Sequence, residues 1–167
     1  MALVTNLATL DVITEAWVDS VKDGLNTGVF SGTYTPTLVG MAVGTGGSAF
    51  NTAWYAFTGG IFTMNGLVTF GTAGTTFPGA TVTVTLPTGF TMPYYSTSHP
   101  IGRCTMGIAG TNYAGSCWTN SGTTARFVVE NVAGTYATVV ATSTTVPATW
   151  AAGSAISYSF TTPATYA

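Results

Sequence analysis

Alternating apolar and polar side chains run through most of the chain from about residue 33 onward. In residues 80–86, valines and a leucine lie on one face of an extended strand and threonines lie on the other. Residues 155–160 repeat the pattern, with Ile156, Tyr158 and Phe160 on one face. This period of two is typical of antiparallel strands that bury one face. Both segments are therefore predicted to be half-buried strands.

Other apolar segments of strand length are separated by residues that favour turns. The further candidate strands are residues 34–43, 50–58, 61–70, 101–109, 113–118, 125–130 and 136–142. Between them lie turn sequences such as Gly59-Gly60, Gly110-Thr-Asn112 and Asn120-Ser-Gly122. About eight to ten short strands with frequent turns predict a mostly β fold, an antiparallel β-sandwich that is jelly-roll-like.

Residues 14–26 have a different period, which predicts a short N-terminal helix. Thr14 is a suitable N-cap and Glu15 lies in the first turn, where the helix dipole favours an acid. Trp17, Val21 and Leu25 then form one apolar stripe. Three leucines upstream either extend this helix or form an anchoring arm: Leu3, Leu7 and Leu10. We therefore divide the chain into an N-terminal arm and helix, residues 1–30, and a β-sandwich domain, residues 31–167.

The apolar stripe needs a surface to cover it, because a helix of this length is marginal alone in water. That surface is either the protein's own β domain or another molecule. In the second case, the upstream leucines and the stripe are the candidate residues for binding a capsid or a sister subunit.

Charged residues make up only 5% of the chain, against about 25% in an ordinary soluble domain. The few charges concentrate in residues 1–26, and residues 27–167 hold only Arg103, Arg126 and Glu130. Three basic residues in total are too few for nucleic-acid binding. Exposed sheet edges are usually protected by charge, especially by lysine. Residues 27–167 contain no lysine. The edges are then short, broken by Pro and Gly, or covered by neighbouring subunits, and the last of these predicts a symmetric oligomer.

No apolar run reaches the roughly 20 residues that a membrane-spanning helix needs. The first ten residues lack a basic region and are followed by acids, which does not fit a secretory signal. We therefore expect a protein that is made in the cytoplasm and does not enter a membrane. This origin favours reduced thiols for Cys104 and Cys117, although a disulfide between them stays open.

The sequence offers little for catalysis, so we expect a non-enzymatic protein without a cofactor or a metal site. Glu130 is the one acid of the β region, and His99 is the one histidine of the chain. Neither a carboxylate pair nor a serine triad can be assembled convincingly from these residues. The glycine-rich sequence Gly44-Thr-Gly-Gly-Ser-Ala49 is interpreted as a β-turn, because no helix is predicted after it.

Aromatic residues remain as candidates for binding. Trp54 and Phe57 are expected in the core. Tyr94, Tyr95 and Trp118 are candidates for a sugar-binding or subunit-contact surface, with core packing as the alternative.

Three stretches of the sequence resemble bacteriophage virion proteins. They are Gly32-Thr-Tyr-Thr-Pro-Thr-Leu38, the hairpin from Trp54 to Phe70 around Gly59-Gly60, and Val82-Thr-Val-Thr-Leu-Pro87. Similar sequences occur in phage tail-fibre tips, head fibres and capsid decoration proteins. The helix of residues 12–26 is similar to attachment segments of small structural proteins from phages of actinobacteria.

This resemblance implies a trimeric jelly roll without catalytic residues. It implies a capsid decoration protein that binds the major capsid protein and copies of itself on the outer surface of the virion. The alternative is a tail-fibre or tail-tip protein that recognises a host glycan.

Overall fold

The computed structural model describes residues 29–79, 81–93, 99–131 and 138–167, and every regular element within them is a strand. The predicted class, mostly β and antiparallel, is confirmed. The predicted helix, residues 14–26, lies outside the described residues. The strands are β1 (Val29–Tyr34), β2 (Leu38–Val39), β3 (Phe50–Thr58), β4 (Ile61–Thr69), β5 (Thr83–Thr85), β6 (Phe90–Thr91), β7 (Pro100–Ile108), β8 (Thr111–Ser121), β9 (Thr124–Asn131), β10 (Thr138–Ala141), β11 (Ala155–Pro163) and β12 (Thr165–Tyr166).

Most of these strands belong to one antiparallel sheet. Its order is β1-β3-β4-β11-β7-β8-β9-β5-β2, and β10 pairs with β9 beside β5. The sheet contains the local hairpins β3–β4, β7–β8 and β8–β9, and β11 lies between β4 and β7. A separate two-stranded sheet joins β12 to β6.

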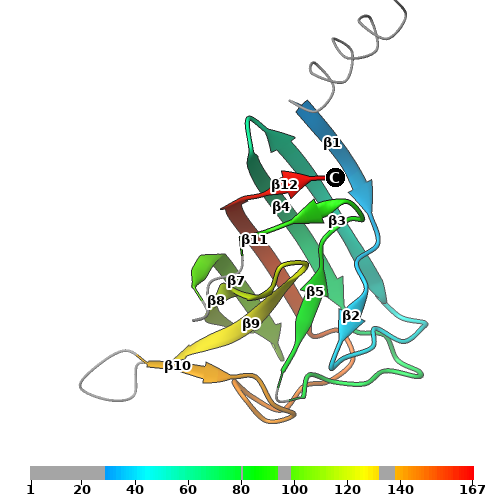
Figure 1. Cartoon of the computed structure of the whole chain (residues 1–167). Coiled ribbons are helices and arrows are strands. Elements are labelled where there is room, and N and C mark those ends of the chain that lie inside the picture. The colour runs from blue at the N-terminus through cyan, green and yellow to red at the C-terminus, as the bar shows by residue number, and fades with distance from the viewer. Residues whose placement is uncertain (1–28, 80, 94–98, 132–137) are drawn as a thin grey trace, which may run out of the picture.

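The sheet curls so that its two ends come together. Strands β1 and β2 stand at opposite ends of the strand order, yet only residues 35–37 separate them in the chain. This connection spans at most about 14 Å when fully extended. The sheet therefore folds back over itself, and Figure 1 shows β2 and β5 on the opposite side of the molecule from β4 and β11.

The prediction of one strand over residues 34–43 is wrong. Strand β1 ends at Tyr34, and the chain then crosses to the other end of the sheet before β2. Pro36 is buried in this crossing, and its carbonyl accepts a hydrogen bond from Asn51 Nδ2 at 2.8 Å. Gly40, with φ of 78°, ends β2 after two residues.

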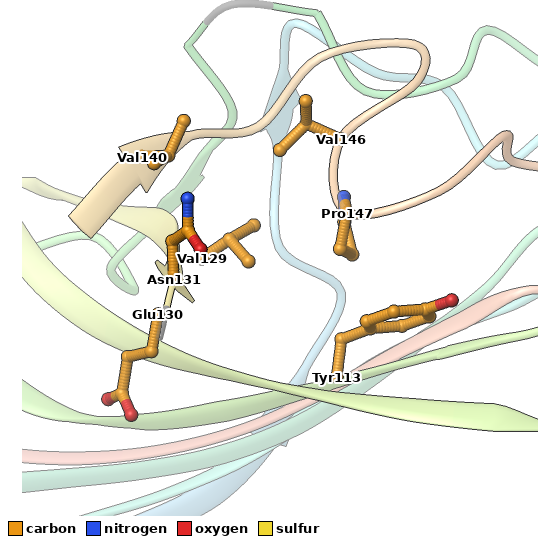
Figure 2. Close-up of a pocket in the computed structure, with 7 residues that line it drawn as sticks. All are labelled: Tyr113, Val129, Glu130, Asn131, Val140, Val146 and Pro147. Atoms are coloured by element: carbon orange, nitrogen blue, oxygen red, sulfur yellow. The ribbon is translucent and has the colours of Figure 1, made fainter. Parts of the chain in front are cut away.

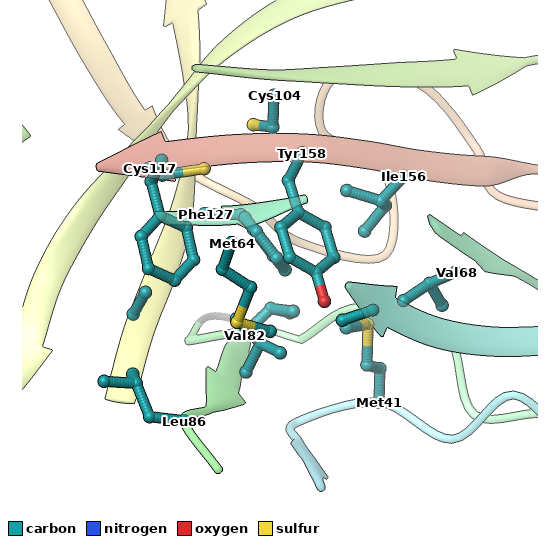
Figure 3. Close-up of a cluster of buried hydrophobic side chains, with 14 of the residues drawn as sticks. Met41, Met64, Val68, Val82, Leu86, Cys104, Cys117, Phe127, Ile156 and Tyr158 are labelled. Atoms are coloured by element: carbon teal, nitrogen blue, oxygen red, sulfur yellow. The ribbon is translucent and has the colours of Figure 1, made fainter. Parts of the chain in front are cut away.

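The core lies inside the curl and receives side chains from both layers. Val82, Val84 and Leu86 are buried, as their alternation predicts. Ile156, Tyr158 and Phe160 are also buried, in agreement with the pattern of residues 155–160. Figure 3 shows side chains of β11 and β9 meeting there, and the rings of Tyr158 and Phe127 lie 5.1 Å apart.

An aromatic cluster closes the end of the curled sheet near the C-terminus. Phe90 in β6 packs against Phe62 at 4.9 Å, Phe57 at 5.4 Å and Tyr166 at 4.9 Å between ring centroids. Tyr166 also contacts Phe30 of β1 at 4.7 Å. The last strand of the chain is thereby fixed beside its first described strand (Figure 1).

Candidate functional site

The outer surface of strands β1, β3, β4 and β11 carries no charged side chain. Residues 29–69 and 155–163 contain no Asp, Glu, Lys or Arg. Because Phe62, Met64 and Val68 point inward from β4, the alternate residues of the same strand point outward. We call the outward-facing residues of these four strands the neutral face.

Two large apolar side chains lie near the middle of the neutral face. Trp54 of β3 is 45% exposed and Leu67 of β4 is 40% exposed. Trp54 pairs with Asn65 and Thr52 pairs with Leu67, so the two apolar residues are diagonal neighbours across the hairpin. Other exposed apolar residues stand at the two ends of the hairpin: Phe50 and Ile61.

The expectation that Trp54 lies in the core is wrong, whereas Phe57 is buried as expected. Strand β3 has aromatic residues on both faces, and the alternation that buries Ala53 and Phe57 turns Trp54 outward. Periodicity alone did not decide which set faces the core, because both sets contain a large aromatic ring.

The charges of the described residues gather on the other half of the sheet, over β7, β8 and β9. Ser116 Oγ donates a hydrogen bond to Glu130 Oε1 at 2.5 Å, and Arg103 is exposed one strand away, opposite Ser116. The guanidinium of Arg126 lies over the Trp118 ring, 5.7 Å from its centroid. This half of the surface therefore carries charged side chains, which the neutral face lacks.

Trp118, a candidate contact residue, is half-buried beneath Arg126. Within the described part of the chain, its indole Nε1 is buried and has no hydrogen-bond acceptor. Arg126 Nε, on the neighbouring strand, is also buried and also has no hydrogen-bond acceptor among the described residues.

The other candidate residues cannot be placed. Tyr94 and Tyr95 lie outside the described residues. So do the candidate capsid-binding or subunit-binding residues Leu3, Leu7, Leu10, Trp17, Val21 and Leu25.

A pocket of about 390 Å³ opens between strands β8, β9 and β10 and the loop that contains Val146 and Pro147. Figure 2 shows the ring of Tyr113 beneath Pro147, whereas the Glu130 carboxylate turns away from both. The pocket is lined mainly by apolar groups: Tyr113, Val129, Glu130, Asn131, Val140, Val146 and Pro147. Its size falls within the usual range for small-molecule pockets.

Among the described residues, the metal-binding residue types are scattered and both thiols are buried. No group of three or more His, Cys, Asp or Glu side chains occurs among the described residues at metal-binding distance. Cys104 and Cys117 are unbonded and buried, and Cys117 Sγ donates to the Arg103 carbonyl at 3.3 Å. A hydrogen bond with the Cys104 thiol and burial raise the pKa of Cys117, which opposes thiolate formation.

No family model, curated protein or solved structure matches the chain. No helix in the described part of the chain is long and apolar enough to cross a membrane.

Proposed function

We propose that this protein is a non-enzymatic structural component of a bacteriophage virion. In this proposal it is a capsid decoration protein that is made in the host cytoplasm and binds the outside of the shell as an oligomer, in the first instance a trimer. The observation that carries the proposal is the neutral face, a four-strand surface without charge that exposes Trp54 and Leu67. The phage context comes from the resemblance of residues 10–90 to virion proteins.

A decoration protein stabilises a shell by burying surface that the assembled particle otherwise exposes to water. Each Å² of apolar surface removed from water contributes about 25 cal/mol, before the cost of association is subtracted. Between copies of the protein, the neutral face supplies such surface without charges that must be desolvated. The N-terminal leucines and the stripe from Trp17 to Leu25 supply the second contact, with the major capsid protein.

The jelly-roll arrangement belongs to the same proposal. The two layers of the curled sheet face each other across one core, as the layers of a β-sandwich do. A head of this type needs only a short anchor, and residues 1–30 have the length for one.

Binding of purified full-length protein to capsids that lack it tests this function. We expect the protein to co-sediment with the capsids and to raise their melting temperature. Trp17→Asp in the stripe is expected to abolish co-sedimentation, and Asp19→Asn, a nearby change outside the stripe, is expected to leave it unchanged. Failure to bind capsids, together with antibody labelling at the tail of intact particles, would contradict the proposal.

A second candidate function is recognition of a host glycan at the tip of a tail fibre. The pocket beside Tyr113 favours it, because an aromatic ring and the nearby Asn131 amide supply the stacking and hydrogen bonding that sugars need. A glycan array tests it with the full chain and Tyr113→Ala. Specific binding that this substitution removes would favour the tail function over decoration.

A further inference from the structure

The neutral face has the composition of a protein contact more than that of a solvated sheet surface. Around Trp54 and Leu67 its outward positions are mostly Thr, Ser, Asn and Ala, with Phe50 and Ile61 at the two ends of the β3–β4 hairpin. Fully buried interface centres are depleted in charge and enriched in aromatic residues, and tryptophan is a frequent hot spot. The hydroxyls at its border are partly satisfied internally, since Thr63 Oγ1 and Thr161 Oγ1 hydrogen-bond at 3.1 Å.

A partner for this face must itself be nearly uncharged at the point of contact. A charged side chain pressed against Trp54 and Leu67 would lose its hydration, and the neutral face offers no opposite charge in return. A second copy of this chain supplies such an uncharged surface in its own neutral face. Its opposite half would bring Arg103, Arg126 and Glu130 into contact with the apolar centre.

The edge strand of the neutral face, β1, is also open to pairing with another chain. Strand β1 hydrogen-bonds β3 on one side, and it has no strand partner on the other side among the described residues. Its sequence, Val29–Tyr34, contains no charge and no proline to discourage pairing with another chain. An uncharged edge beside an uncharged apolar face is therefore exposed to association.

We propose that the neutral faces of two or more copies of this chain pack against one another, with Trp54 and Leu67 at the centre of the contact. This inference deepens the proposed function and rests on it only for its biological role. The contact joins copies into the oligomer, and the N-terminal stripe is left to hold the shell.

Sedimentation velocity on the full chain at micromolar concentration tests the contact. We expect an oligomer for the natural sequence, and at least roughly 30-fold weaker association for Trp54→Lys, as for loss of a hot-spot residue. Leu67→Lys is expected to act in the same direction. Thr111→Lys adds the same charge at an exposed position of the β7–β8 hairpin and is expected to leave association unchanged. Circular dichroism and thermal melting check that each variant is folded.

Cross-linking tests the geometry without weakening the contact. Because Cys104 and Cys117 are buried, Asn65→Cys introduces an exposed thiol on the neutral face, and Thr111→Cys is its matched control. A short bismaleimide is expected to cross-link copies through position 65 and not through position 111.

A monomeric full chain at micromolar concentration overturns the inference. So does an oligomer that Trp54→Lys and Leu67→Lys leave intact, because the contact then lies elsewhere, for example in the N-terminal segment. The two proposals fail separately. Capsid binding by a monomer contradicts the self-contact alone, and an oligomer that ignores capsids contradicts the decoration function alone.

Discussion

At Gly66 the core leaves no room for a side chain, because the neighbouring strand places Tyr158 over it. The two residues are paired in register between β4 and β11. A Cβ added at Gly66 would lie 2.2 Å from the ring carbon Cζ of Tyr158. Aromatic rings often cover a strand glycine in this way. The pair therefore fixes both the register of the two strands and the position of the ring.

We predict that Gly66→Ala lowers the free energy of unfolding by about 1–3 kcal/mol, as for other overpacked cores. Urea denaturation measures it. Gly79→Ala is the control, since its nearest neighbouring atom lies at 3.7 Å and an added methyl group fits there. Combining Gly66→Ala with Tyr158→Leu is expected to cost less than the sum of the two single losses. Strictly additive losses would show that the ring is not the obstacle.

Buried phenols make the fold sensitive to alkaline pH. Burial raises the pKa of Tyr34 to about 12, although the nearby Thr85 side chain opposes the rise. Burial also raises the pKa of Tyr158, with smaller contributions from Tyr34 and Cys117. In the unfolded chain both phenols ionise near pH 10. The folded state therefore retains protons that the unfolded state releases between pH 10 and 12.

Stability is accordingly expected to be fully retained below pH 10 and to fall as the pH rises from 10 to 12. Urea midpoints across this range measure the loss. Tyr34→Phe is expected to reduce the slope, whereas Tyr113→Phe, which leaves both buried phenols in place, is expected to preserve it. A pH-independent midpoint up to pH 12 would contradict the assignment.

The β3–β4 and β7–β8 hairpins use the same type of turn with different residues. Gly59 and Gly60 connect β3 to β4 with φ of 57° and 80°. Ala109 and Gly110 connect β7 to β8 with φ of 49° and 81°. Two consecutive residues with positive φ are the mark of a type I′ turn, which strongly prefers glycine and asparagine. Ala109 is therefore the strained member of the four.

We predict that Ala109→Gly stabilises the protein by up to about 1 kcal/mol and that Gly59→Ala destabilises it by a similar amount. Thermal unfolding of both variants beside the natural chain measures the two shifts. No atom lies near an added Cβ at Gly59, so backbone conformation is the whole effect there. Shifts of the same sign for both variants would contradict this explanation.

Local sequence patterns were enough to predict most strands but not their ends or distant pairings. The hairpin of β3 and β4 follows from its apolar residues and Gly59-Gly60, and its predicted bounds agree with the structure to within a residue. Strand β6 has two residues and pairs with β12, about 75 positions away, so neither had a local pattern to reveal it. The crossing after Tyr34 was likewise read as a continuation of a strand, because it depends on how the whole sheet curls.

The candidate site was harder to predict than the fold, because it depends on which face of each strand meets the core. The sequence offers Trp118 as a candidate contact residue, with core packing as the alternative. The structure makes it half-buried and places the Arg126 guanidinium from the neighbouring strand over its ring. Trp54 was assigned to the core and is exposed instead. The sequence alone shows that residues 29–69 contain no charged residue. It does not show that β11 lies beside β4, and this pairing is what extends the uncharged strands into the neutral face.

The distribution of charge over the molecule predicts how the association of copies responds to salt. The proposed contact contains no ionisable side chain, so screening by added salt has nothing to weaken. We expect the dissociation constant of the oligomer to change by less than about twofold between low and physiological salt, and sulfate to strengthen association. Sedimentation velocity at several salt concentrations measures it. Pronounced weakening by sodium chloride would indicate that Arg103 and Arg126 make the contact instead.

The positions of the two arginines also determine where trypsin can cut the native protein. Arg103 lies in β7 between β11 and β8, and Arg126 lies in β9 between β8 and β5. Trypsin cuts only chain that can leave its strand, and both positions are hydrogen-bonded into the sheet on two sides. Lys22 is the remaining basic residue of the chain. Trypsin is therefore expected to leave both arginines uncut in the native protein, so a digest made without denaturation should contain no cuts within the described strands.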